Sequence, residues 1–225
     1  MCMEEIDISI YADESELAKT AVLDALSLIN AKLQDKGECH IALTGGTLGN
    51  LISTKLAEHL NRGEWEGLHI WWSDERFVPF TSSDRNDLEF VNSINDFSKV
   101  KVHRAPIEGD VNHAAELFNE EIEKVDFDLM ILGMGPDGHV ASLFPNQIHD
   151  DEKRAVFAVT DSPKPPKERI TLSLRKINGS NEIWLVASGE AKSEAIASLI
   201  EEDQSLPVSH VNLTRLMVDS AAFGI

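Results

Sequence analysis

The chain has 225 residues, of which 42% are hydrophobic and 26% charged, a balance typical of a globular protein and unlike that of a disordered one. Its 39 acidic and 20 basic residues give a formal net charge of −19, which argues against nucleic acid and anionic membranes as partners because both attract clustered Lys and Arg. No apolar run approaches the roughly 20 residues of a membrane helix, and the acidic N-terminal segment does not have the pattern of a signal peptide. The two cysteines are too few for a disulfide framework. We therefore expect a cytoplasmic protein.

The first half of the chain alternates strand-like and helix-like patterns. Residues 6–12 alternate apolar and polar side chains as a strand does. Asp13 with Glu16 predicts a capped helix start, and Gly37 predicts its end. Further on, the patterns predict strands at 39–46, 69–73 and 100–104 and helices at about 48–62, 84–97 and 110–124.

The second half continues the alternation. Residues 127–135 are apolar enough for a central strand covered on both faces, and strands at 155–160, 169–174 and 182–189 precede a helix at 190–202. Strands alternating with helices predict an α/β fold, a single domain over residues 1–225 with a mostly parallel sheet and helices on both faces. Ligands of such sheets bind beyond the carboxyl ends of the strands, so the loops after the strands are where a site is expected.

The first of these loops contains Gly45, Gly46 and Thr47 between a strand and a helix. The glycines allow a sharp turn, and the helix start behind them offers free N–H groups to an anion. A tight turn with no ligand explains the same residues. The Gly-Lys-Ser/Thr ending of a nucleotide-binding loop is absent, so no nucleotide is inferred.

The second and fourth loops carry cations. In the second, Asp74 and Glu75 can hold Arg76 for two-pronged binding of a phosphate or carboxylate, although a surface ion-pair cluster is the alternative. In the fourth, residues 162–170, prolines stiffen the backbone around Lys164 and Arg169, or form a connector with solvated cations. The two stretches 74–86 and 164–169 hold a quarter of the chain's cations, which fits a pocket for an anionic small molecule: Arg76, Arg85, Lys164, Lys167 and Arg169.

The third loop follows the most apolar strand and contains His139. A histidine has an ordinary pKa near 6.5 and can act as a general base, and Asp137 can accept a hydrogen bond from one ring nitrogen or contact substrate. Little side-chain bulk surrounds it, because glycines occupy positions 133, 135 and 138. A structural or surface role suits the other histidines: His40, His59, His69, His103, His113, His149 and His210.

No motif for a metal or cofactor appears. The chain lacks His-x-x-x-His, Cys-x-x-Cys, an acidic calcium loop and a Gly-x-Ser-x-Gly elbow. Residues 133–138 have the glycine spacing of a dinucleotide-binding loop, but they come too late in the chain and no acidic residue follows at the required distance. We therefore predict neither a metal nor a cofactor.

The four loops, in order, resemble the glucosamine-6-phosphate isomerase/6-phosphogluconolactonase family. The similar segments are LTGGT (43–47), WWSDERFVP (71–79), FDLMILGMGPDGHVASLFP (127–145) and PKPPKERIT (163–171). The resemblance, strongest to the lactonases, implies a Rossmann-like, cofactor-free enzyme that hydrolyses 6-phosphoglucono-δ-lactone in the pentose phosphate pathway.

By this resemblance His139 corresponds to the general base, and we pair it with Asp137. Sugar and phosphate contacts are expected from the substrate-binding set, which is Gly45, Gly46, Thr47, Asp74, Arg76, Gly135, Lys164 and Arg169. Two departures stand out. Thr47-Leu48-Gly49 replaces the family's Ser-Thr-Pro, which puts the hydroxyl contacts in doubt. Arg85 replaces a serine near the expected pocket mouth, where it binds phosphate or points outward.

Two other functions remain open. A glucosamine-6-phosphate deaminase has a carboxylate shortly after its histidine, whereas residues 141–145 here read ASLFP. A non-enzymatic sugar-phosphate sensor usually carries a DNA-binding helix-turn-helix, for which the chain has no spare residues. The sequence leaves the choice between monomer and homodimer open.

Overall fold

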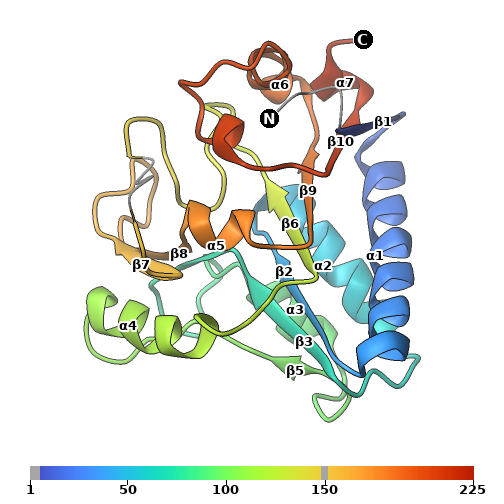
Figure 1. Cartoon of the computed structure of the whole chain (residues 1–225), viewed down its shortest axis with the longest axis vertical. Coiled ribbons are helices and arrows are strands. Elements are labelled where there is room, and N and C mark those ends of the chain that lie inside the picture. Colours follow the sequence, from blue (N-terminus) through green and yellow to red (C-terminus); the bar gives the residue numbers. More distant parts are fainter. Residues whose placement is uncertain (1–5, 148–151) are drawn as a thin grey trace.

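The computed structural model describes residues 6–147 and 152–225 (Figure 1). Its centre is a sheet of parallel strands in the order β1-β10-β9-β6-β2-β3-β5. The order reverses direction at β2 and β6, as in doubly wound folds. The strands are β1 (Asp7–Tyr11), β2 (Cys39–Leu43), β3 (Leu68–Trp72), β5 (Lys101–Val102), β6 (Leu129–Gly133), β9 (Glu182–Ala187) and β10 (Arg215–Asp219).

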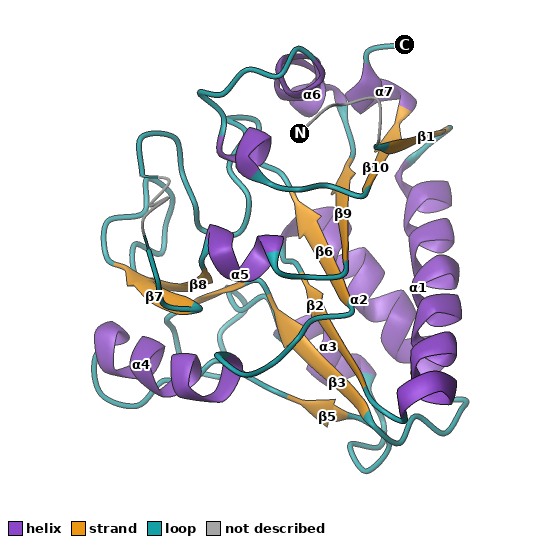
Figure 2. Cartoon of the chain, viewed as in Figure 1, coloured by secondary structure: helices purple, strands orange, loops and turns teal. Residues whose placement is uncertain are grey.

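Helices cover both faces of this sheet, as predicted (Figure 2). One hydrophobic cluster joins one face to α1 (Glu14–Lys36), α2 (Gly46–Leu60) and α3 (Leu88–Ser93). A second joins the other face to α4 (Val111–Ile122), α5 (Leu174–Asn178), α6 (Ser193–Ile200) and α7 (Ser220–Phe223). Short 3₁₀ turns lie at Glu190–Lys192 and Pro207–His210.

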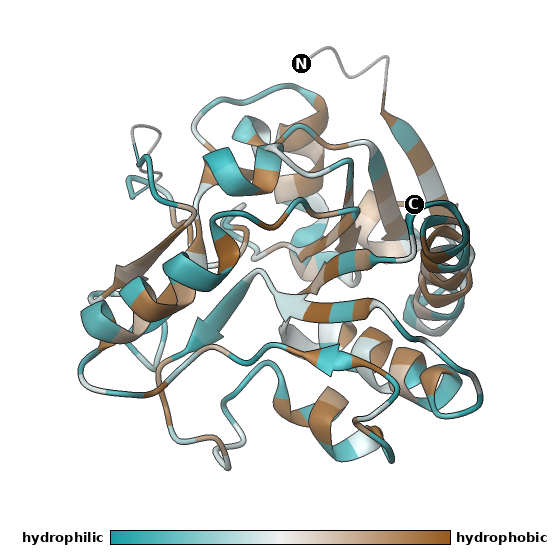
Figure 3. Cartoon of the chain, turned by 60° about the horizontal axis from the view of Figure 1, so that its bottom comes forward, coloured by the Kyte–Doolittle hydropathy of each residue, from teal (hydrophilic) through white to brown (hydrophobic). Residues whose placement is uncertain are grey.

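The helices are amphipathic, with hydrophobic and hydrophilic residues on different sides (Figure 3). In α4, for example, the buried positions recur every three or four residues and face the sheet: Val111, Ala114, Ala115, Phe118 and Ile122. Within the described ranges, no helix combines the length and apolar character needed to cross a membrane.

The ends of α1 confirm the predicted capping residues. The Asp13 side chain accepts a hydrogen bond from the backbone N–H of Glu16, and the Glu16 carboxylate accepts one from Ala12 N–H, at 2.9 Å each. Gly37 ends the helix in the left-handed region with φ of 74°, a conformation that glycine adopts without strain.

A small antiparallel sheet lies beside α4 and contains β4 (Asp74–Arg76), β8 (Arg169–Leu172) and β7 (Val156–Val159) in that order (Figure 1). The strands at 155–160 and 169–174 were predicted, but their place in a separate sheet was not, and β4 was not predicted at all. Because β4 pairs with β8, Arg76 lies opposite Arg169, so the second and fourth loops meet.

The predicted helix at 84–97 is wrong at both ends, since α3 covers only Leu88–Ser93. The Glu75 carboxylate accepts hydrogen bonds from the backbone N–H groups of Asn86 and Asp87, at 2.7 and 3.0 Å. This long-range contact holds the preceding residues in turns. The sequence patterns also missed three elements: α5, β10 and α7.

Candidate active site

A pocket of about 370 Å³ opens at the carboxyl ends of β2, β6 and β9. All four loops singled out from the sequence contribute to its wall. The predicted site residues that line it are Gly45, Gly46, Thr47, Asp74, Arg76, Gly135, His139, Lys164 and Arg169. The structure therefore brings together side chains that are more than 120 positions apart in the chain.

The β2–α2 loop presents a helix N-terminus to this pocket. Gly45 occupies the N-cap position of α2 with no side-chain cap, and the first turn contains no acidic residue. A Cβ on Gly45 would lie only 1.7 Å from Asn86 Oδ1, so no larger residue fits there. Residues 44–49 line the pocket, so the free backbone N–H groups at the start of α2 lie at its wall, where they favour an anion.

His139 and Asp137 form a hydrogen-bonded pair. Asp137 does not line the pocket; it lies behind the ring, with Oδ1 2.5 Å from His139 Nδ1. A carboxylate accepts, so Nδ1 carries the ring proton and Nε2 keeps its lone pair. A Cβ on Gly135 would lie 1.9 Å from Nδ1, so this glycine makes room for the pair.

The protonation state of His139 suits a base. Burial lowers the pKa of His139 below its ordinary value, and this outweighs the opposing effect of Asp137. The Lys164 ammonium, 3.3 Å from Nδ1, lowers the pKa of His139 further. Burial alone would raise the pKa of Asp137, but His139 and Lys164 bring it below its usual range. At neutral pH the pair is therefore a neutral imidazole with a carboxylate.

Cations gather on the wall of the pocket. Arg76, Lys164 and Arg169 were predicted there, and Lys192 from the turn after β9 joins them. Burial, followed by the charge of Lys164, lowers the pKa of Lys192. Sequence reasoning missed Lys192, although its position after the carboxyl end of a strand was a usable signal.

Arg169 donates most of its hydrogen bonds to backbone carbonyls of the fourth loop. Its Nε donates to Pro166 O at 3.1 Å, and Nη2 donates to the carbonyls of Lys164 and Pro165 at 3.3 and 3.2 Å. The third nitrogen, Nη1, lies 3.8 Å from Asp74 Oδ2. Arg169 thus fixes the backbone that carries Lys164.

Asp74 likewise connects separate segments of the chain through hydrogen bonds. Its Oδ2 accepts from Ser142 Oγ at 2.6 Å, and its Oδ1 accepts from Asn86 Nδ2 at 3.0 Å. Asn86 also lines the pocket, is 2% exposed, and has a buried Oδ1 without a hydrogen-bond partner. Sequence reasoning did not predict Asn86 as a site residue.

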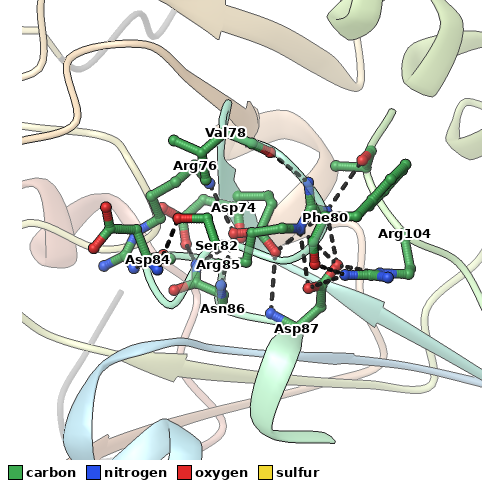
Figure 4. Close-up of polar contacts among 12 residues, drawn as sticks. Asp74, Arg76, Val78, Phe80, Ser82, Asp84, Arg85, Asn86, Asp87 and Arg104 are labelled. Atoms are coloured by element: carbon green, nitrogen blue, oxygen red, sulfur yellow. Dashed lines mark hydrogen bonds and ion pairs between the residues drawn. The ribbon is translucent and has the colours of Figure 1, made fainter. Parts of the chain in front are cut away.

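Arg85 neither binds at the pocket mouth nor points outward, so that expectation is wrong. It is 2% exposed and does not line the pocket. Its guanidinium pairs with Asp87 at 2.7 Å and lies 3.6 Å from Glu75, while Arg104 binds the same Asp87 carboxylate at 2.8 Å (Figure 4). The Phe80 ring lies within 5 Å of both guanidinium carbons. This buried ion-pair network replaces the expected contact with phosphate.

Glu75 connects this network to the pocket wall. Besides the N–H groups of Asn86 and Asp87, its carboxyl accepts from Arg76 N–H at 2.8 Å. Burial raises the pKa of Glu75 to about 7, against the opposing effect of Arg85. The Arg76 side chain leaves β4 toward the pocket, and its Nη1 donates to Asp84 O at 2.5 Å. Lys167, counted among the candidate cations, is exposed and does not line the pocket.

The sequence of the chain is similar to those of sugar-phosphate enzymes. Residues 12–218 match the family model described as glucosamine-6-phosphate isomerases/6-phosphogluconolactonase. The 6-phosphogluconolactonase of Mycobacterium tuberculosis is 36% identical over 211 residues, which cover 86% of this chain and 85% of that protein. The corresponding protein of Streptomyces coelicolor is 34% identical over 210 residues, covering 84% and 80%.

The fold agrees with the same group. The crystal structure of 6-phosphogluconolactonase from Thermotoga maritima superimposes with a TM-score of 0.84 at 28% identity, covering 96% of this chain and 100% of that one.

Proposed function

Because the chain belongs to the family of glucosamine-6-phosphate isomerases and 6-phosphogluconolactonases, we propose that it hydrolyses 6-phosphoglucono-δ-lactone to 6-phosphogluconate in the oxidative pentose phosphate pathway. One observation carries the proposal: a neutral histidine, held by a carboxylate, faces a pocket whose wall bears four cations. This combination joins a base for water activation to a binding site for a phosphorylated substrate.

In the proposed reaction, His139 Nε2 takes a proton from water as the water oxygen attacks the lactone carbonyl carbon. Asp137 holds the Nδ1 proton and stabilises the imidazolium that forms. The tetrahedral intermediate then collapses, the bond to the ring oxygen breaks, and that oxygen receives the proton from His139. A lactone carbonyl is electrophilic enough that this sequence requires neither a metal nor a covalent enzyme intermediate.

The negative oxygen of the intermediate needs hydrogen-bond donors. The uncapped N–H groups at the start of α2, in the Gly45–Thr47 loop, are the donors we propose for it or for the substrate hydroxyls. Groups of this kind are already oriented before substrate arrives, so they stabilise developing charge without reorganisation.

We propose two different roles for the cations of the pocket. We assign the substrate phosphate to Arg76, Lys164 and Lys192, which line the pocket. Arg169 and Asp74 act mainly as positioning residues, because most of their donors and acceptors are already filled within the protein.

The deaminase alternative finds no support in the pocket. The residues after His139 offer no carboxylate: Ala141 lines the pocket, and Ser142 is turned away to donate to Asp74. An isomerising deaminase needs such an acid near its histidine, which the lactonase reaction does not.

A lactonase assay tests the proposal. Purified protein is added to freshly generated 6-phosphogluconolactone, and acid release is measured above the spontaneous rate. We expect saturable hydrolysis with the wild type and a rate about 10²- to 10⁴-fold lower with His139→Ala. Release of ammonia from glucosamine 6-phosphate without lactone hydrolysis would instead identify a deaminase.

A further inference from the structure

A cluster of histidines lies around the amino-terminal ends of β2 and β3, whereas the pocket lies at the carboxyl ends of the strands. His40 and His69 are the second residues of β2 and β3 and are paired in register, and Glu38 lies in the turn between α1 and β2. His103 follows β5 and stacks on the ring of Trp71 at 3.6 Å. This edge is at the bottom of Figure 1, where α1 leads into β2.

Three ligand atoms converge there. Glu38 Oε1 lies 3.3 Å from His69 Nε2, and Glu38 Oε2 lies 3.6 Å from His40 Nε2. All three groups offer a ligand atom within 4.8 Å of one another. For bonds of 2.0–2.1 Å, the ligand atoms of a tetrahedral zinc ion are about 3.3–3.4 Å apart, so only a small closure is needed.

The hydrogen bonds behind His69 leave a lone pair facing this cluster. Glu121 Oε1 is 2.5 Å from His103 Nδ1, which therefore carries a proton. When His103 is neutral, its Nε2 accepts from His69 Nδ1, which lies 2.9 Å away, and the proton of the neutral His69 ring is then on Nδ1. In this state His69 Nε2 keeps its lone pair, 3.3 Å from Glu38 Oε1.

One ring nitrogen of this cluster has no hydrogen-bond partner. His69 is 7% exposed, and its Nε2 is buried without a hydrogen-bond partner. A ring lone pair and a carboxylate oxygen 3.3 Å apart repel each other unless a cation lies between them.

We propose that Glu38, His69 and His40 bind one divalent transition-metal ion of the zinc type at the amino-terminal edge of the sheet. Two imidazole nitrogens and a carboxylate suit zinc, whereas calcium and magnesium prefer oxygen ligands throughout. The chain Glu121–His103–His69 supplies the outer hydrogen bonds that orient a metal-bound imidazole. The ion joins the α1–β2 turn to β2 and β3 and takes no part in catalysis.

His40 changes its hydrogen bonding when it binds the ion. In the structure Trp71 Nε1–H donates to His40 Nδ1 at 3.2 Å, which places the ring proton on Nε2. Coordination through Nε2 moves that proton to Nδ1 and releases the Trp71 indole. The indole N–H of Trp71 is therefore an internal reporter of occupancy.

Calorimetric titration of the full-length, untagged and chelator-washed protein with ZnCl₂ tests the site. We expect one ion per chain and a rise in melting temperature, with MgCl₂ giving neither. Glu38→Gln, at an exposed position, and His40→Gln should weaken binding by at least the roughly 10- to 100-fold that is typical of losing an outer hydrogen-bond partner of a ligand, whereas His113→Gln on the exposed side of α4 should not. In ¹H–¹⁵N spectra the Trp71 indole signal should shift with zinc in the wild type only.

Several outcomes would overturn the proposal. They are the absence of zinc binding, unchanged affinity in Glu38→Gln, and an indole signal that stays in place at saturation. Binding lost in His139→Ala but kept in Glu38→Gln would place the ion in the pocket instead. Lactone hydrolysis by Glu38→Gln should equal that of the wild type, so the two proposals fail independently.

Discussion

Two segments that line the same pocket use charge in opposite ways. In the β6 loop, residues 134–145, His139 is held at one nitrogen by Asp137 and keeps the other nitrogen open. In the β4 segment, residues 74–87, Arg85 directs its donors to Asp87 and to backbone carbonyls, and none of them reaches the pocket. Groups that act on a ligand retain an unused donor or acceptor, whereas groups that build the wall have theirs filled.

The largest effect on turnover should come from the β6 loop. His139→Ala removes the proposed base, and general base catalysis typically contributes about 10²–10⁴-fold, so we expect kcat to fall by that factor. The substitution also removes a ring whose centroid lies 4.8 Å from that of Phe144, so a modest fall in melting temperature is expected, and kcat is compared at a temperature at which both proteins are folded. His113→Ala, at an exposed position on α4, is the matched control and should keep full activity. Near-normal turnover in His139→Ala would contradict the mechanism.

The largest effect on stability should come from the β4 segment. Arg85→Ala leaves Asp87 and Glu75 buried with one cation fewer, and breaking a buried pair on one side typically costs about 3–5 kcal/mol. Arg85→Ser, the residue common in the family, should cost a similar amount because it removes the same charge. Urea denaturation measures the loss, and the exposed Arg62→Ala should stay within about 0.5 kcal/mol of the wild type.

If Arg85→Ala unfolds at the wild-type urea concentration, the network is not a stabilising element. If the variant keeps its stability but loses affinity for the phosphorylated lactone, Arg85 belongs with the binding cations after all. The two measurements therefore separate the wall from the site.

The difference between these two segments also shows which features the sequence could predict. Alternating strand and helix patterns predicted most of the parallel sheet, because its longer helices and most of its strands show recognisable apolar patterns, although the internal strand β10 was missed. The length of α3 could not be predicted, since it depends on Glu75, which lies 11 positions before Asn86 and binds its backbone. A three-residue strand such as β4 is too short to show any period.

The same limit applies to the site. His139 and the Gly45–Thr47 loop were predictable because both follow apolar strands, where a parallel sheet places its ligands. The burial of Arg85 was not, because its partners Asp87, Val78 and Ala105 come together only in the folded chain. Counting cations per segment cannot distinguish an arginine that binds substrate from one that is already paired.

Arg76 tests whether the β4 segment contributes one cation to the ligand. Arg76→Ala should raise KM for the phosphorylated lactone roughly 10- to 100-fold, as expected for a charge-assisted contact of about 1.5–3 kcal/mol. The loss should be much smaller with unphosphorylated gluconolactone. Lys167→Ala removes a nearby cation that does not line the pocket and should leave KM unchanged. Equal losses on both lactones would mean that Arg76 holds the wall or the sugar ring.

The smallest expected effect is a displacement of the pH profile. The pKa of His139 is lowered, so the base form persists below pH 6.5 and the acid limb of kcat/KM should fall at a lower pH than for an ordinary histidine. Lys164 helps to lower the pKa of His139, so Lys164→Met should move the acid limb of the kcat/KM profile to higher pH. This shift in pH is separate from any change in the maximal value of kcat/KM. The substrate phosphate titrates near pH 6 as well, but identically for both enzymes, so the difference between their profiles reports His139. A limb that stays in place in Lys164→Met would show that the ammonium does not act on His139 during turnover.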